Sequence, residues 1–244
     1  MSVVHINNKT LGYQPIWQSN MLCDFVVEDH VDIWRININS SLINLNRFYS
    51  ILNASEISRA NRYLRKQDRE KFIISRGALR FILANYLKLL PQSILFLPGL
   101  NNKPYVAGSI EFNLSDSEDW VIVGVGKSPL GLDVEYIKPA FEYDIIIDNY
   151  FNETERTFIK SSESLKRFFL LWTRKEALLK ATGIGLMDDL LMISSVDGKH
   201  TIEGKLLATT ENWFLNSFEV ANDHIATIAL NNFNTNFSFW NFGK

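Results

Sequence analysis

Two parts of the sequence repeat one pattern, a basic helical segment followed by an aliphatic strand. "RGALRFILANYL" and "TRKEALLKATGIGL" read as helices that carry basic residues, and "FNLSDSEDWVIVGV" and "FEVANDHIATIAL" pass from polar residues into an aliphatic run. A helix or sheet with one apolar side must bury that side against another element. The repeat predicts an α+β fold with two similar lobes in a pseudo-twofold arrangement, each a small sheet packed against a long helix.

The boundary between the lobes is placed in the turn around "GKSPLG". We expect an N-terminal lobe over residues 1–128 and a C-terminal lobe over residues 129–244, and a chain of 244 residues is long enough for two cores. The turn is not a phosphate-binding loop. Its first glycine would fall at Val121, and Pro129 interrupts the helix that should follow.

Composition excludes several classes of protein. A net charge of −2 and a pI near 6.1 argue against a protein that coats nucleic acid or an anionic membrane. The only cysteine is Cys23, so no intrachain disulfide can form, which fits a reducing cytoplasm. No apolar run approaches the roughly 18 residues that span a bilayer, and the N-terminus shows no leader pattern. We therefore expect a soluble cytoplasmic monomer without a nucleic-acid or membrane partner.

A basic helical segment occupies residues 53–90, and Asn53 or Ser55 could cap its start. Two sets of basic residues each lie on one helical face: Arg59, Arg62 and Lys66, and Arg69, Arg76 and Arg80. Such stripes are usually solvated surface. The alternative interpretation is a site for an anionic ligand.

The segment "LGLDVEYIKP" reads as a strand with an apolar side and an acidic side. Asp133 and Glu135 project from one side, and Leu132 and Val134 from the other. This can be an ordinary exposed strand. However, neighbouring carboxylates repel each other unless they share a cation, and oxygen ligands suit Mg²⁺.

The helical segment "FFLLWTRKEALLKATGIGL" places charge in its middle. Trp172, Glu176 and Lys180 recur every four residues and so form one ridge. The simplest interpretation is a packing aromatic beside a surface ion pair. Alternatively, Glu176 supplies a third carboxylate to Asp133 and Glu135, while Lys175 and Lys180 face phosphate oxygens. That arrangement would suit phosphoryl transfer.

Together these motifs resemble the two-lobed 4′-phosphopantetheinyl transferases of the surfactin-synthetase type. The family pattern is met by "GLDVE" (131–135) and by "WTRKEALLKATGIGL" (172–186). The basic helix, the "KP" of Lys103 and Pro104, and "FNLSDS" appear in the family's order. The resemblance covers roughly residues 50–225.

The resemblance implies that the protein moves phosphopantetheine from coenzyme A to a serine of an acyl or peptidyl carrier protein, with Mg²⁺ as cofactor. It implies that Asp133, Glu135 and Glu176 hold the metal, and that Glu176 and Lys180 are catalytic. The implied coenzyme contacts are Arg59, Arg62, Arg76, Lys103, Pro104, Ser115, Asp116 and Lys175. Carrier choice is expected in residues 141–169.

One departure from the family concerns Asp116, which stands where the family usually has a histidine that helps hold the 3′-phosphate. An aspartate there would repel the phosphate by about 1 kcal/mol at a separation of ~4 Å in a water-like medium. Two other functions are kept open. One is a coenzyme-binding homologue without transferase activity, and the other is a metal-dependent nuclease that uses Asp133 with the E-x-K of Glu203 and Lys205.

Overall fold

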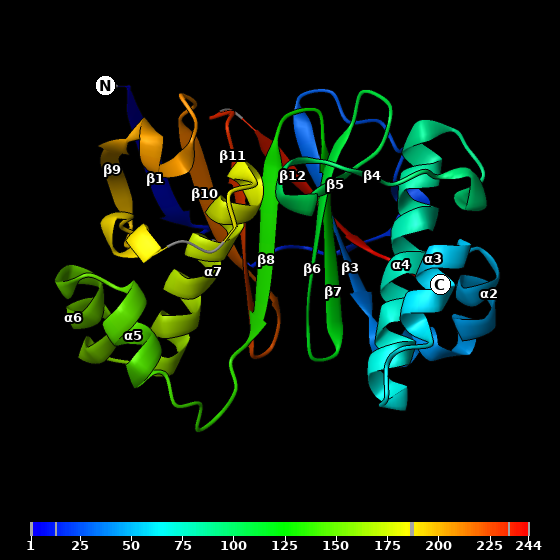
Figure 1. The fold of residues 1–244 in the computed structure, drawn as a ribbon, viewed down its shortest axis with the longest axis horizontal. Helices are drawn as coiled ribbons and strands as arrows, with labels where there is room; N and C mark the ends of the chain where they lie inside the picture. Colours follow the sequence, from blue (N-terminus) through cyan, green and yellow to red (C-terminus); the bar gives the residue numbers. More distant parts are fainter. Residues whose placement is uncertain (1, 13, 186–187, 234, 244) are drawn as a thin grey trace.

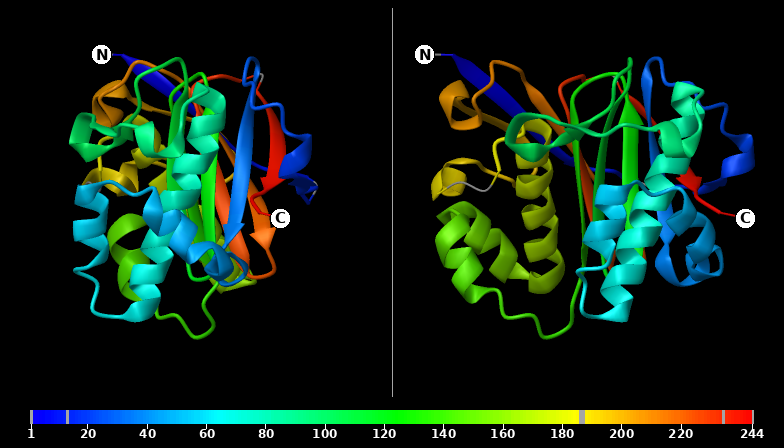
Figure 2. Two further views of the ribbon diagram at one scale, coloured as in Figure 1. Left: turned by 90° about the vertical axis from the view of Figure 1, so that its right-hand side faces the viewer. Right: turned by 45° about the vertical axis from the view of Figure 1, so that its right-hand side comes forward.

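The computed structural model describes residues 2–12, 14–185, 188–233 and 235–243. Two five-stranded sheets stand next to each other in the middle of the molecule, and helices pack against each (Figures 1 and 2). This confirms the predicted α+β class. No helix in the described ranges is long and apolar enough to cross a membrane.

The strands of the first sheet lie in the order β2-β12-β3-β7-β6. Their bounds are β2 (Gln18–Ser19), β12 (Asn236–Asn241), β3 (His30–Asn37), β7 (Trp120–Gly126) and β6 (Glu111–Ser117). The second sheet has the order β8-β11-β10-β1-β9. Its strands are β8 (Leu130–Tyr136), β11 (His224–Leu230), β10 (Trp213–Ala221), β1 (Val3–Thr10) and β9 (Gly198–Glu203). A short hairpin joins β4 (Leu97–Pro98) to β5 (Pro104–Tyr105).

Each sheet has one long helix, as the repeated pattern predicts. α4 (Lys66–Leu87) packs with the first sheet, and α7 (Ser164–Thr182) packs with the second (Figure 1). The shorter helices are α1 (Ile38–Ser41), α2 (Leu45–Ser50), α3 (Ala54–Ala60), α5 (Asp144–Tyr150) and α6 (Glu153–Ser161). The 3-10 turns are η1 (Asn20–Leu22), η2 (Leu42–Asn44), η3 (Pro91–Ser93), η4 (Leu100–Asn102), η5 (Asp188–Met192) and η6 (Gly204–Leu207).

The terminal strands cross between the two halves of the chain. β1 lies in the second sheet, where it pairs with β9 and β10, and β12 lies in the first sheet beside β3. The predicted boundary between residues 128 and 129 therefore does not hold for the first and last strands of the chain, because each lies in the sheet of the other half. Each half of the sequence contributes a terminal strand to the other half's sheet, so the two units are linked at both ends.

The helical segment that was predicted for residues 53–90 is broken. Asn53 begins α3 with a capping box, in which its side chain accepts from the Glu56 amide and the Glu56 carboxylate accepts from the Asn53 amide. The chain then turns before α4. The expected stripe of Arg69, Arg76 and Arg80 is wrong at one position, because Arg80 is fully buried and pairs with Glu56 at 2.8 Å. Arg80 ties α3 to α4.

The two sheets meet where the edge strands β6 and β8 face each other. β8 pairs with β11 on one side, so on its other side every second backbone amide needs another acceptor. Side chains of β6 fill this need, and we call the three bonds the β6–β8 ladder. They run from Leu132 N to Asn113 Oδ1 (2.9 Å), from Val134 N to Ser115 Oγ (3.4 Å) and from Tyr136 N to Ser117 Oγ (3.0 Å).

Helix α7 approaches β8 very closely at Gly131. A Cβ atom on Gly131 would lie 2.1 Å from the carbonyl oxygen of Ala177 and 2.2 Å from the amide nitrogen of Ala181. Both atoms belong to the helix backbone, which cannot move aside as a side chain can. The glycine of "GLDVE" therefore sets the distance between the acidic strand and the helix that carries Glu176 and Lys180.

We predict that Gly131→Ala lowers the free energy of unfolding by at least about 3 kcal/mol, at or beyond the upper end of ordinary overpacking. Urea unfolding followed by circular dichroism measures this. Gly12→Ala is the matched control, because its Cβ would meet nothing within 4 Å. Equal stability of the two variants would contradict the close approach.

Candidate active site

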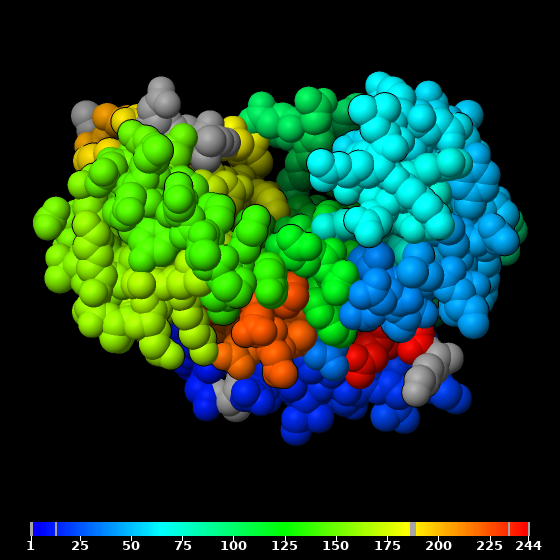
Figure 3. Space-filling model, turned by 90° about the horizontal axis from the view of Figure 1, so that it is seen from below, coloured from blue at the N-terminus to red at the C-terminus, as the bar shows by residue number. Residues whose placement is uncertain are grey.

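Three neighbouring cavities form a row across the junction of the two sheets, in the hollow between the two halves that is visible in Figure 3. The central cavity, of about 410 Å³, contains the acidic residues of β8. A cavity of about 270 Å³ on the α3 and α4 side shares Leu114 and Asp116 with it. A third, of about 260 Å³ beside η4, shares Leu114, Glu176 and Lys180 with it. The row is an elongated groove.

Asp133 and Glu135 both line the central cavity, because alternate residues of β8 project from the same side. Asp133 is only 4% exposed. Its Oδ1 accepts from Ser115 Oγ at 3.0 Å and from Lys180 Nζ at 2.6 Å. Its Oδ2 is buried and has no hydrogen-bond partner within the described part of the chain. A buried carboxylate oxygen without a partner is costly and marks a place for a cation or a donor.

The predicted ridge on α7 faces the same cavity. Trp172, Glu176 and Lys180 all line it, so the spacing of four residues does place the three side chains on one side of the helix. Besides Asp133, the Lys180 ammonium group also donates to Ser115 Oγ at 2.9 Å. Because Lys180 and Asp133 come from different elements, their ion pair joins α7 to β8 across the cavity.

The other two carboxylates are poorly compensated. Burial, together with the neighbouring charge of Asp133, raises the pKa of Glu135 to about 7. Burial and Asp133 also raise the pKa of Glu176, and Lys180 opposes this shift. With Asp116, four carboxylates therefore line the cavity beside one lysine, and the site favours an additional positive charge or protons.

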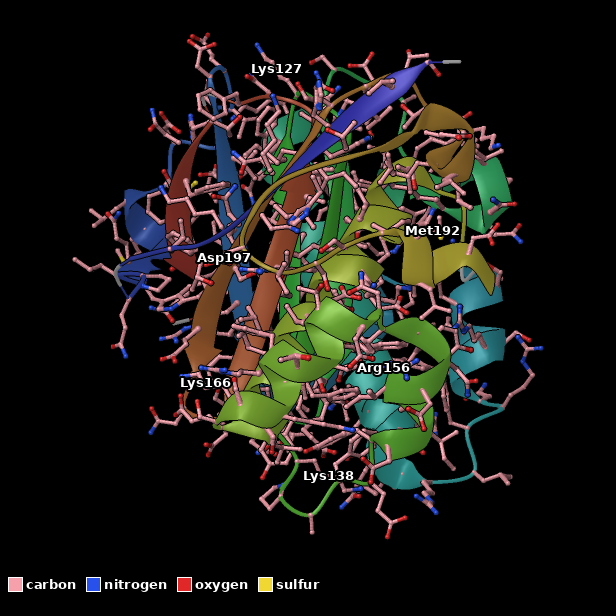
Figure 4. All side chains as sticks on the ribbon, turned by 90° about the vertical axis from the view of Figure 1, so that its left-hand side faces the viewer. Lys127, Lys138, Arg156, Lys166, Met192 and Asp197 are labelled. Carbon is pink, nitrogen blue, oxygen red and sulfur yellow. The ribbon has the colours of Figure 1, made fainter. Side chains whose placement is uncertain are left out.

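Lys175 is not a phosphate contact, and that prediction is wrong. Its side chain is fully buried on the far side of α7, where Nζ lies 3.0 Å from a carboxylate oxygen of Glu155. Nζ also donates to the carbonyl oxygens of Leu190 and Ile193. Glu155 in turn accepts from both the amide and the hydroxyl of Ser195. Lys175 ties α7 to α6 and to the chain after η5; Figure 4 views this side of the molecule and labels Arg156 on α6.

The cavity on the α3 and α4 side gathers several of the predicted coenzyme contacts. Arg59, Arg76 and Asp116 line it, as do Lys71 and Ser75, whereas Arg62 is not among its lining residues. Burial, the largest effect, lowers the pKa of Arg76. Arg59 and Arg76 both lie over the ring of Phe72, so one aromatic ring contacts both guanidinium groups. This end of the groove is suited to an anion.

Asp116 has a partner that the sequence did not suggest. Lys71 Nζ lies 2.7 Å from Asp116 Oδ2, and both side chains border the cavity. The repulsion expected between Asp116 and an anion is thus offset within the protein, although the pair also occupies Lys71. A lysine five residues before Arg76 on α4 carries no motif of its own, so this pair becomes visible only when α4 is placed against β6.

At the opposite end of the groove, Lys103 and Pro104 line the third cavity together with Glu176 and Lys180. The ammonium group of Lys103 donates to the carbonyl oxygens of Leu130 (2.8 Å) and Ala181 (3.3 Å). Lys103 therefore binds the strand β8 and the C-terminal end of α7, where a cation complements the helix dipole.

Asn101 was missed by the sequence analysis and makes a related contact. Its amide nitrogen donates to the carbonyl oxygen of Gly183 at 2.5 Å. Gly183 ends α7 in the left-handed conformation, with φ of 72°. Its carbonyl is free for Asn101 because the helix stops there. Leu186, the last residue of the second motif, lies outside the described residues.

Comparison with known proteins identifies the family of this chain. A family model described as the 4′-phosphopantetheinyl transferase superfamily matches residues 129–229, and one described as 4′-phosphopantetheinyl transferase, N-terminal, matches residues 39–127. The chain is 29% identical over 227 residues to the 4′-phosphopantetheinyl transferase HetI of Nostoc sp., a match that covers 89% of this chain and 94% of that protein.

Two further relatives match over shorter regions. The 4′-phosphopantetheinyl transferase gsp of Aneurinibacillus migulanus is 33% identical over 129 residues, which are 51% of this chain and 53% of that protein. The transferase Sfp of Bacillus subtilis is 27% identical over 166 residues, which are 64% of this chain and 73% of that protein. The chain belongs to the 4′-phosphopantetheinyl transferase superfamily, as the two motifs predict, and is an enzyme of that family.

We predict that Glu135→Gln raises the free energy of unfolding at pH 8 in the absence of divalent metal. Because the folded protein raises the pKa of Glu135 to about 7, its ionised form destabilises the fold. The gain should be near zero below pH 4.5, grow as the pH rises to 7 and stay constant above it.

Urea unfolding in EDTA at pH 5 and pH 8 tests this prediction. Glu211→Gln, at an exposed glutamate in the loop before β10, is the control and should change little at either pH. A Glu135→Gln protein that is less stable than the wild type at pH 8 would contradict the unfavourable charge.

Proposed function

We propose that this protein transfers the 4′-phosphopantetheine arm of coenzyme A to a serine of an acyl or peptidyl carrier protein, with Mg²⁺ as cofactor. One observation carries the proposal. In a member of this superfamily, the three carboxylates of the two motifs and Lys180 come from β8 and α7 to line one cavity. The groove continues on both sides of this cavity, as an extended ligand requires.

The residues fit a divalent cation. Asp133, Glu135 and Glu176 would hold it, and the buried Oδ2 of Asp133 lacks any other partner in the described part of the chain. Among the described residues, no three acidic, histidine or cysteine side chains already stand close enough to enclose an ion. In this structure the ammonium group of Lys180 lies against Asp133 instead. When bound, Mg²⁺ would neutralise pyrophosphate charge and orient the phosphate that is transferred.

The protein's own groups supply the remaining chemistry. The serine hydroxyl of the carrier attacks the phosphorus atom that bears pantetheine, and the bond from this phosphorus to the bridging oxygen breaks. Adenosine 3′,5′-bisphosphate leaves with the electron pair. Glu176 accepts the serine proton, a role suited to a carboxylate whose pKa is raised toward neutrality. Lys180 stabilises the charge that develops on the leaving oxygen.

The two ends of the groove would hold the rest of the coenzyme. Arg59 and Arg76, with Arg62 nearby on the chain, are proposed to meet the 3′-phosphate, and Ser115 and Asp116 border the same region. Lys103 and Pro104 are proposed to lie beside the adenine. The carrier is expected to contact residues 141–169. We retain the proposals of a cytoplasmic monomer that binds neither nucleic acid nor membranes.

The two alternative functions receive less support. For the nuclease, Glu203 and Asp133 would have to share a metal, but they lie on β9 and β8, the opposite edges of the second sheet. Glu203 pairs with Lys205 at 2.6 Å. A coenzyme-binding homologue without activity would not need Asp133, Glu135, Glu176 and Lys180 to meet in one cavity.

Transfer is tested by incubating the protein with coenzyme A, Mg²⁺ and a panel of carrier proteins, and by weighing each carrier by mass spectrometry. We expect one carrier or more to gain the phosphopantetheine arm. Asp133→Ala and Glu176→Ala should each lower turnover at least about 100-fold. Lys180→Ala should lower kcat more than coenzyme affinity, because its contact strengthens in the transition state. Near-normal turnover of Asp133→Ala at saturating Mg²⁺ would contradict the metal assignment.

We further predict that Asp116→His tightens coenzyme A more than 3′-dephospho-coenzyme A, and does so more at pH 6 than at pH 8. The substitution removes a negative charge, releases Lys71, and adds an imidazole that is cationic at the lower pH. Calorimetric titration of both ligands measures the difference. Asp116→Asn releases Lys71 without a titrating ring and should show the preference at both pH values alike. Equal effects on the two ligands would show that Asp116 does not face the 3′-phosphate.

A further inference from the structure

The serine rungs of the β6–β8 ladder make a second bond that the asparagine rung does not. Ser115 Oγ accepts from the Val134 amide and donates to Asp133 Oδ1. Ser117 Oγ accepts from the Tyr136 amide at 3.0 Å and donates to Glu135 Oε2 at 3.1 Å. The asparagine rung, at Asn113, accepts from the backbone of β8 and makes no hydrogen bond to a carboxylate within the described part of the chain.

We propose that Ser117 is a positioning residue, which holds the Glu135 carboxylate in place as a ligand of the divalent cation. The inference rests on the proposed function, since the cation belongs to that function. Ser117 is the last residue of "FNLSDS", and the sequence analysis assigned it no role at the metal.

The geometry explains why Glu135 needs such a residue. Glu135 is half-buried, has a longer side chain than Asp133, and lies near the charges of Asp133 and Glu176. A mobile carboxylate in that position gains by turning toward water, away from its negative neighbours. Lys180 holds Asp133 in the cavity, but Glu135 forms no ion pair with any of the described residues. Among the described residues, the hydroxyl of Ser117 is the side-chain group that donates a hydrogen bond to Glu135.

The oxygen of the Ser117 hydroxyl both accepts one hydrogen bond and donates another. Its lone pair satisfies the Tyr136 amide, which fixes the oxygen relative to the backbone of β8. Its single proton then points to one oxygen of Glu135, which leaves the second carboxylate oxygen available to a cation. Ser117 belongs to β6, but its hydroxyl is hydrogen-bonded to β8, the strand that carries Glu135. The hydroxyl therefore fixes the Glu135 carboxylate relative to Asp133, two residues earlier. Such outer partners of metal ligands typically change metal affinity by about 10-fold to 100-fold.

The test measures Mn²⁺ affinity with saturating coenzyme A and no carrier, by water-proton relaxation, so that no turnover is required. We expect Ser117→Ala to weaken Mn²⁺ binding about tenfold. Ser117→Thr keeps the hydroxyl and should restore the affinity to within about twofold of the wild type.

Two controls separate positioning from a general loss of structure. Asn113→Ala removes a ladder rung that touches no carboxylate, so it should lower the unfolding midpoint without changing Mn²⁺ affinity. Ser238→Ala, in β12 and also half-buried, should change neither.

The outcomes distinguish this inference from the proposed function. A wild-type protein that binds no Mn²⁺ would overturn the cation and the inference together. Wild-type binding with unchanged affinity in Ser117→Ala would overturn the role of Ser117 alone. Equal weakening in Ser117→Ala and Asn113→Ala would also overturn it, because the effect would then come from the ladder as a whole.

Discussion

The backbone amides of β8 need hydrogen-bond acceptors on the side where no strand pairs with it. The way in which these acceptors are supplied determines the shape of the candidate site. An unpaired row of amides at the centre of the molecule would be costly. The polar residues of β6 meet it with side chains, at the spacing of two that a strand imposes. Because side chains and not backbone join the sheets, space remains at the junction. The groove lies in that space.

The same junction also brings charges from separate elements together. Gly131 lets α7 lie directly on β8, and this brings Lys180 to 2.6 Å from Asp133. Without the close approach, the ridge of α7 would stand farther from the acidic strand, and Glu176 would not share a cavity with Asp133. The glycine of "GLDVE" thus sets the distance between β8 and α7, and this distance places the two carboxylates of the same motif next to the ridge of α7.

The sequence predicted what depends on local periodicity. The alternation of β8 and the four-residue ridge of α7 predicted which side of each element carries the carboxylates and Lys180, and these side chains do line one cavity. The sequence analysis did not predict the positions of side chains that depend on contacts between different elements. Lys175 is next to Glu176 in sequence, but one residue along a helix is about 100° around it, and the acceptor at Glu155 lies in α6. Lys71 and Asn101 carry no motif, and Ser117, the last residue of "FNLSDS", had no assigned role, since the partners of all three come from other elements.

Lys175 and Lys180 of α7 have different roles: the first stabilises the fold, and the second lines the candidate site. Lys175 is buried with a carboxylate, two carbonyls and no solvent, so all its donors are used within the fold. Breaking a buried pair of this kind typically destabilises a protein by about 3–5 kcal/mol. Lys180, about 1.4 turns later, borders a cavity in which carboxylates outnumber cations. Lys175 fixes α7 to α6. The side of the helix that carries Glu176 and Lys180 borders a cavity with excess negative charge, which a cation or protons would neutralise.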